Sequence, residues 1–298
     1  MGAVHRVTTR RRGRVSHWTV KRAYWNQYTE ASVRSEVEFT NRCRSAGVAA
    51  PRSVPRVDDG YVLILDRVGD PQQYRVLAWA DGRPGDPGDD RTIAPLAGWL
   101  ARIHGLAADA RSQRIDDWFV RVRHDWPDLI RRLENAAPAL AGTMRARLAD
   151  LRTLTAFVNE NRDRDAVWCH TDIGASNLIW TDNGAQLIDW ENSGPLVPRQ
   201  ELGAFLRSLG SRERARNAYR VYRCAGGPAE ITDPGHFATS IATHLNYLGG
   251  QSELLLDATH PEQHEFARGQ AANAARNLPT IDQLVEMTAD LHDGSVRR

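Results

Sequence analysis

One segment of the chain places acids and amides between short apolar runs, and it limits the folds open to the chain. It reads VWCHTDIGASNLIWTDNGAQLIDWENSG and spans residues 167–194. The Asn183-Gly184 pair in its middle favours positive φ at both central positions of a two-residue turn, so the segment is predicted to form a hairpin. In that register Leu178 faces Asp189, and the Asn177 side chain can reach a point shared with the Asp189 carboxylate.

The polar residues of this segment have a spacing that suits phosphoryl chemistry. His170, Asp172 and Asn177 form H-x-D-x-x-x-x-N, and Asp189 follows the hairpin. Asn177 and Asp189 offer hard oxygen donors, so we predict that they bind Mg²⁺. Asp172, on the loop that enters the hairpin, is predicted to accept a proton from a hydroxyl and to orient it for in-line attack. His170 is predicted to brace this loop, because a histidine base would make Asp172 redundant.

The chain contains a single lysine. Of its 39 basic residues 38 are arginine, and the exception is Lys21. Residues 3–24 are predicted to form two strands around the turn RRRG, with Lys21 on the second strand. A compact ammonium suits nucleotide phosphates, and a glutamate on the next helix is expected to hold it. On the helix predicted at 29–46, Glu36 is the favoured partner and Glu38 the alternative.

The rest of the chain changes from strands to helices. Strands are predicted at 61–66 and 73–80, and the Gly/Pro/Asp-rich stretch 81–90 is predicted to be a loop between lobes. Beyond it the periodicity predicts helices at about 92–108, 118–135, 138–161, 199–224, 236–256 and 262–291. The predicted fold class is α+β. Residues 1–80 would form a small antiparallel sheet lobe with one helix, and residues 81–298 a larger, mainly helical lobe that carries the hairpin.

Composition excludes several classes of protein. The sequence has neither an apolar run long enough for a membrane span nor a signal pattern, and its three cysteines form no C-x-x-C pair. We therefore predict a cytoplasmic protein without a disulfide framework or a membrane partner. Residues 1–80 carry 14 basic against 7 acidic residues, which is too weak a basic patch to predict nucleic-acid binding. The sequence carries no indication of oligomeric state.

Several stretches carry a family resemblance. HTDIGASNLIW, LIDWENSG and LARIHGLA, together with GVAAPRSVP and QYRVLAWADGRP, resemble the aminoglycoside phosphotransferases and choline-kinase-like small-molecule kinases over about residues 15–210. The resemblance implies a bilobal, protein-kinase-like fold with ATP or GTP and Mg²⁺ as cofactors. It also implies roles for individual residues: Asp172 as base, Asn177 and Asp189 as metal ligands, Lys21 on the phosphates, and backbone groups at Leu77–Ala80, chiefly Trp79 and Ala80, on the purine.

The sequence departs from the family pattern in one respect. Such kinases have a further strand and a phosphate-covering loop before the lysine strand, whereas only twenty residues precede Lys21. The turn at residues 10–14 has one glycine and is no G-x-G-x-x-G. We expect either a further strand upstream of Met1 or a different cover over the phosphates.

The acceptor is predicted to be a small molecule with a hydroxyl group. Glu191 and the acidic balance of residues 81–298 suit a cationic acceptor, and Trp190 is a candidate for stacking on a ring, as are Trp118 and Trp126. An aminoglycoside-type or other antibiotic is the leading prediction. The alternatives are a small-metabolite kinase acting on homoserine, choline or a sugar, and a non-catalytic kinase-like binding protein.

Overall fold

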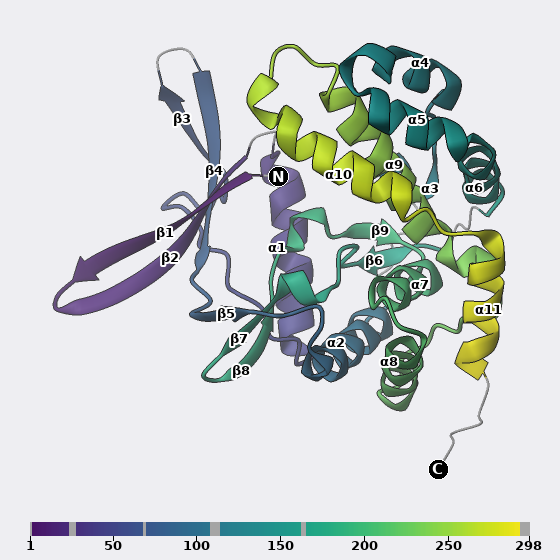
Figure 1. Cartoon of the computed structure of the whole chain (residues 1–298). Coiled ribbons are helices and arrows are strands. Elements are labelled where there is room, and N and C mark those ends of the chain that lie inside the picture. The colour runs from purple at the N-terminus through teal and green to yellow at the C-terminus, as the bar shows by residue number, and fades with distance from the viewer. Residues whose placement is uncertain (1, 24–27, 68–69, 108–113, 162–164, 293–298) are drawn as a thin grey trace. The chain divides into compact units, whose positions relative to one another are not determined.

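The structure is a computed structural model that describes residues 2–23, 28–67, 70–107, 114–161 and 165–292 (Figure 1). Contacts group the chain into two compact units. The first contains residues 1–108, 170–194 and 220–227, and the second contains the remaining residues, 109–169, 195–219 and 228–298. The predicted lobe boundary at residue 81 does not coincide with this division, because residues on both sides of it contact segment 170–194; the Leu187 amide, for example, donates to the Ala49 carbonyl at 2.8 Å.

The first unit contains a four-stranded antiparallel sheet in the order β1-β2-β4-β3 (Figure 1). Its strands are β1 (Gly2–Arg11), β2 (Arg14–Ala23), β3 (Leu63–Arg67) and β4 (Asp70–Ala78). Arg12 and Gly13 both have positive φ, as a two-residue hairpin turn requires, which confirms the predicted turn. In the pairing of β2 with β4, Lys21 lies opposite Arg75.

One helix accompanies this sheet. Helix α1 (Glu30–Ser45) begins with a capping box between Thr29 and Ser32, and it ends before Gly47, whose φ of +83° is a conformation that glycine adopts without strain. Val33 and Val37 of α1 pack with Val62 in a small buried cluster. The helix predicted at 29–46 is thus confirmed.

The central segment forms a second, three-stranded sheet in the order β5-β7-β8. Its strands are β5 (Gly82–Pro84), β7 (Leu178–Thr181) and β8 (Gly184–Leu187). Strand β5 lies inside the stretch predicted to be a loop. A Cβ atom on Gly82 would lie 2.0 Å from the carbonyl oxygen of Trp180, so the close approach of β5 to β7 depends on glycine. A 3₁₀ turn η1 (Asp90–Thr92) and helix α2 (Ile93–Gly105) follow.

The register of the β7–β8 hairpin differs from the prediction. Leu178 pairs with Leu187 and Thr181 with Gly184, so the turn is Asp182-Asn183 and Leu178 does not face Asp189. The Thr181 hydroxyl accepts from the Asn183 amide and donates to the Gly184 carbonyl, which stabilises this turn. Positive φ is needed only at Gly184, at +104°.

The second unit is mainly helical. Its described helices are α3 (Asp117–Val120), α4 (Trp126–Ala136), α5 (Pro138–Ala146), α6 (Leu148–Glu160), α7 (Pro198–Ser208), α8 (Arg212–Cys224), α9 (Ala238–Leu254), α10 (His264–Arg276) and α11 (Ile281–His292). It also contains strands β6 (Val167–Cys169) and β9 (Gly194–Leu196) and the short 3₁₀ turns η4 (Pro234–Phe237) and η5 (Pro261–Gln263). Two of these elements are divided between the units by residue number: residues 220–224 of α8 and Gly194 of β9 are grouped with the first unit. Helix α9 contacts α3, α6, α7 and α10, and its side chains Ile241, Leu245 and Leu248 are fully buried.

Four of the predicted long helices are interrupted. The break between α7 and α8 contains Gly210 with a φ of +67°, and the break between α10 and α11 contains Pro279. Asp125 caps the start of α4 by accepting from the Asp128 amide, and Arg147 separates α5 from α6. These local signals outweigh a hydrophobic period that continues across them.

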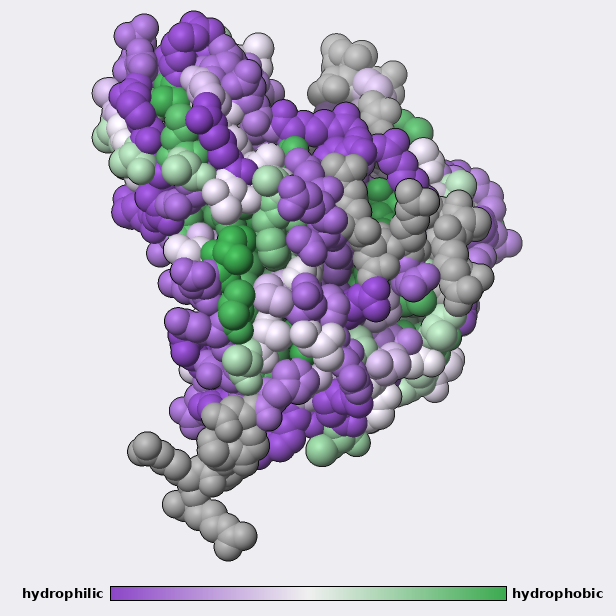
Figure 2. All heavy atoms as spheres, turned by 90° about the vertical axis from the view of Figure 1, so that its right-hand side faces the viewer, coloured by the Kyte–Doolittle hydropathy of each residue, from purple (hydrophilic) through white to green (hydrophobic). Residues whose placement is uncertain are grey.

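One face of the molecule is largely polar. Figure 2 shows hydrophilic residues over most of the face that it draws, with hydrophobic residues in small patches. Among the described residues, no helix has both the length and the apolar character needed to cross a membrane.

Candidate active site

Lys21 lies among carboxylates of the segment that follows β8. Its Nζ atom donates to Asp189 and, at 3.1 Å, to Glu191 Oε2. Burial alone would lower the pKa of Lys21, but the charges of Glu191 and Asp189 and the hydrogen bonds to both outweigh it, so this pKa lies above its ordinary value. The ammonium therefore stays charged at neutral pH.

A second group of contacts orders the loop that carries Asp172. Asn177 Nδ2 donates to the Asp172 carbonyl oxygen at 2.7 Å and to its carboxylate Oδ2 at 3.0 Å. His170 is fully buried, with Nε2 3.1 Å from the Ile188 carbonyl oxygen, and its Nδ1 accepts from the Asp172 amide at 3.3 Å. Asp172 itself is exposed to solvent. These contacts are of the kind that a bracing histidine would make.

Two residues near these groups have backbones in the left-handed region: Thr171 lies in this loop just before Asp172, and Asp189 follows strand β8. Thr171 has a φ of +68° and Asp189 a φ of +67°, a region that a β-branched residue such as threonine rarely adopts. The Thr171 hydroxyl donates to the Asn192 carbonyl at 2.7 Å, and the Ile188 amide donates to the Asn177 carbonyl at 2.8 Å. The surrounding hydrogen bonds thus hold Asp172, Asn177 and Asp189 in one connected group.

The predicted ion pair between Glu36 and Lys21 is wrong. Glu36 instead forms two hydrogen bonds with Arg75, of 2.6 and 2.7 Å, and both side chains are almost fully buried. Arg75 lies beside Lys21 in the sheet, and its planar guanidinium matches a carboxylate at two points. The lysine therefore pairs with Asp189 and Glu191 instead.

Two of the predicted binding positions need revision. Trp190 is 4% exposed, packs edge-on against His170 at 4.7 Å between ring centroids and donates to the Leu187 carbonyl, so the prediction that it stacks on an acceptor is wrong. The Trp79 amide donates to the His17 carbonyl at 3.3 Å, so only the Trp79 carbonyl remains for the expected purine contact. Its ring lies under the Arg6 guanidinium at 5.1 Å, and Ala80 next to it is partly exposed.

Comparison with protein families gives a match that covers most of the chain. The model of the phosphotransferase enzyme family matches residues 3–234. The chain belongs to this family. The predicted reaction class, phosphoryl transfer, is thereby confirmed. A comparison with curated protein sequences finds no match.

Solved structures similar to this phosphotransferase confirm the predicted protein-kinase-like fold. An aminoglycoside phosphotransferase from Alicyclobacillus acidocaldarius is 18% identical with a TM-score of 0.58, covering 92% of this chain and 87% of its own. A spectinomycin phosphotransferase in complex with ADP and spectinomycin is 12% identical, with a TM-score of 0.69 and coverages of 97% and 90%. A microcompartment-associated aminopropanol kinase is 14% identical, with a TM-score of 0.59 and coverages of 97% and 94%.

The donor atoms of the phosphotransferase fit a divalent cation. Asn177 commits its amide nitrogen to Asp172, so its carbonyl oxygen is the atom that can face a metal. Asp189 adds a carboxylate that already attracts the Lys21 ammonium. Two oxygen donors of this kind are the ligands that Mg²⁺ prefers, with water and phosphate completing its shell.

Sequence reasoning missed three residues that contact this site. Arg75 could have been found, because the predicted strands 15–24 and 73–80 place it within reach of Lys21 once they are paired. Tyr28, whose hydroxyl donates to Glu191 Oε2 at 3.0 Å, gives no periodic signal because it lies outside any strand or helix. Gln73, which contacts the Tyr28 backbone, reads as an ordinary strand residue.

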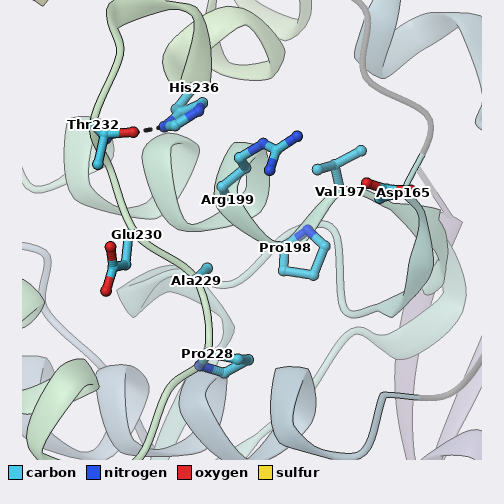
Figure 3. Close-up of a pocket in the computed structure, with 9 residues that line it drawn as sticks. All are labelled: Asp165, Val197, Pro198, Arg199, Pro228, Ala229, Glu230, Thr232 and His236. Carbon is cyan, nitrogen blue, oxygen red and sulfur yellow. Dashed lines mark hydrogen bonds between the residues drawn. The ribbon is translucent and has the colours of Figure 1, made fainter.

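A separate pocket of about 490 Å³ lies within the second unit, between residues 197–199 and 228–236 (Figure 3). Arg199 lies between His236 and Val197 in that view, and the Thr232 amide donates to His236 Nδ1 at 3.2 Å. Burial and the charge of Arg199 lower the pKa of His236. The described residues that line this pocket include none of the predicted site residues, so it forms no part of the candidate active site.

Proposed function

We propose that this phosphotransferase transfers the γ-phosphoryl group of ATP or GTP to a hydroxyl group of a small molecule. The observation that carries the proposal is the connected group of Asp172, Asn177, Asp189 and Lys21. It combines a solvent-exposed carboxylate, two hard oxygen donors and a cation, which are the parts that phosphoryl transfer requires of a protein.

Each residue has a separate role in this proposal. Lys21 binds the nucleotide phosphates, and Asp172 accepts the proton of the acceptor hydroxyl and aims its oxygen at phosphorus. Asn177 orients the Asp172 carboxylate and, with Asp189, would hold Mg²⁺. When bound, Mg²⁺ neutralises phosphate charge that develops during transfer.

The remaining predicted residues support these groups. His170 braces the catalytic loop through its two ring nitrogens. Backbone groups at Trp79 and Ala80 contact the purine. Glu36 acts on the nucleotide site only through Arg75, and Glu191 acts through Lys21 rather than on the acceptor.

The first candidate acceptor is an aminoglycoside-type or other antibiotic. It is supported by the likeness of the fold to antibiotic phosphotransferases and by the net negative charge of residues 81–298, which suits a cationic acceptor. The likeness to an aminopropanol kinase supports amino alcohols and similar metabolites as a second class. A cytoplasmic location is part of the proposal, and it is supported by three cysteines that carry thiols rather than disulfides.

The test is nucleotide-dependent phosphorylation across a panel of acceptors. ADP or GDP release would be coupled to an optical assay with antibiotics, homoserine, choline, amino alcohols and sugars, in the presence of Mg²⁺. We expect turnover with at least one acceptor and a loss of about 10²–10⁴-fold in kcat for Asp172→Asn, with nucleotide affinity retained. The matched control is Asp182→Asn, an exposed aspartate in the hairpin turn, which should leave kcat unchanged.

Two results would contradict the proposal. One is the absence of nucleotide binding by calorimetry with Mg²⁺ present. The other is an Asp172→Asn variant that turns over as fast as the wild type on an accepted substrate.

A further inference from the structure

Tyr28 is attached to the sheet through its backbone. The Gln73 side chain on β4 accepts from the Tyr28 amide at 2.6 Å and donates to the Tyr28 carbonyl oxygen at 3.0 Å. A side-chain amide thus makes the two hydrogen bonds that a neighbouring strand would make. Tyr28 has a fixed position although it belongs to no strand or helix.

The ring of Tyr28 is held as firmly as its backbone. It packs against the cluster of Val33, Val37 and Val62, and the Arg75 guanidinium lies 5.2 Å from its centroid. Its hydroxyl is therefore presented in one direction, where it donates to Glu191 Oε2 at 3.0 Å.

Glu191 links the Tyr28 hydroxyl to the Lys21 ammonium. The same Oε2 atom accepts from Lys21 Nζ at 3.1 Å, so the tyrosine and the lysine share one carboxylate oxygen. Glu36, the carboxylate expected to hold Lys21, is committed to Arg75. In this chain Lys21 is therefore held by Asp189 and Glu191. Among the described residues, Tyr28 is the second group, besides Lys21, that donates a hydrogen bond to the Glu191 carboxylate.

We propose that Tyr28 is a positioning residue of the enzyme: its hydroxyl fixes Glu191, and Glu191 holds the Lys21 ammonium in place for the nucleotide phosphates. The second half of this inference rests on the proposed function, in which Lys21 binds phosphate. The first half concerns only this chain's own contacts and can be tested without nucleotide.

The single lysine makes a direct test available. Protein labelled with ¹⁵N-lysine has one side-chain ammonium resonance, and its protons exchange slowly enough to be seen near neutral pH only when the ammonium is held in ion pairs. We expect a sharp resonance in the wild type, a broader one in Tyr28→Phe and the broadest in Glu191→Gln, where the ion pair with Asp189 remains but the one with Glu191 is lost. The matched control is Tyr61→Phe, because Tyr61 packs on the same valine cluster and also has an arginine, Arg34, over its ring.

Steady-state kinetics give the second readout. Tyr28→Phe removes one hydrogen bond to a charged group but keeps the packing of the ring, so we expect the nucleotide KM to rise roughly 3- to 10-fold while kcat changes little. Tyr61→Phe should leave KM unchanged.

The two readouts separate the possible failures. If the wild type shows the resonance but binds no nucleotide, the proposed function is wrong and the contact among Tyr28, Glu191 and Lys21 stands. If the wild type binds nucleotide and Tyr28→Phe leaves both the resonance and KM as in the wild type, the inference about Tyr28 is overturned while the proposed function stands.

Discussion

At the scale of single residues, the neighbouring cations Lys21 and Arg75 show why position 21 has a lysine although every other basic residue of the chain is an arginine. Arg75 binds one carboxylate, Glu36, at two parallel points, as a planar guanidinium does best. Lys21 places one nitrogen against two carboxylates that reach it from different positions, Asp189 and Glu191. A compact ammonium with three rotatable donors suits the second geometry better than a guanidinium.

The buried pair of Glu36 and Arg75 leads to a stability prediction. Glu36→Gln or Arg75→Gln leaves its partner as a buried charge without its counter-ion, so we expect each to lower the free energy of unfolding by about 3–5 kcal/mol. The double variant Glu36→Leu/Arg75→Met should lose less than either single variant, because no buried charge remains. Chemical denaturation would measure all three.

The control for this pair lies on the surface. Arg132 and Glu253 form an ion pair in which both side chains are at least 40% exposed. Arg132→Gln should therefore cost less than about 1 kcal/mol. If Arg75→Gln and Arg132→Gln lowered the free energy of unfolding equally, burial of the Glu36–Arg75 pair would make no difference to stability, which would contradict the prediction.

At the scale of elements, patterns along the chain predicted most strands and helices but not their pairing. The alternation in residues 15–22 identified β2, and the Arg-Gly turn identified its hairpin with β1. The β7–β8 turn was placed one residue too late, because the Thr181 hydroxyl stabilises Asp182-Asn183 and outweighs the general preference for Asn-Gly. Strand β5 has only three residues, and its identity comes from its pairing with β7.

Gly82 permits a test of the β5–β7 contact. A methyl group at this position would collide with the Trp180 backbone, so we expect Gly82→Ala to lower the free energy of unfolding by about 1–3 kcal/mol. Gly98→Ala in helix α2 is the matched control, because the space around Gly98 is open. That variant should be neutral or stabilise by about 0.5–1 kcal/mol. Similar unfolding midpoints for the two variants would contradict the close approach.

At the scale of the whole molecule, residues far apart in sequence make up each compact unit. Segment 170–194 belongs to the first unit through the Leu187 amide, which donates to the Ala49 carbonyl at 2.8 Å, and through the packing of Trp190 on Phe39 of α1. The second unit contains three histidines that share one electrostatic property. Burial lowers the pKa of His124, His236 and His244.

These histidines predict how stability changes with pH. A histidine whose pKa is lower in the folded than in the unfolded state binds a proton more readily when unfolded, so its contribution is complete above about pH 6.5 and is lost as the pH falls below it. We expect the urea midpoint of unfolding to fall between about pH 7 and pH 5. His244→Gln should reduce this fall. A midpoint that is constant or rises toward pH 5 would contradict the prediction.

The sequence by itself determined the chemistry of the candidate site and the class of the fold. The spacing of His170, Asp172 and Asn177, followed by Asp189, identifies those residues as candidates, because a loop and the hairpin that follows it are local in sequence. Only the tertiary structure decided the partners: Arg75 rather than Lys21 for Glu36, Glu191 and Tyr28 for Lys21, and the core rather than an acceptor for Trp190. Ion pairs and burial depend on which strands lie side by side, and periodicity along one strand does not contain that information.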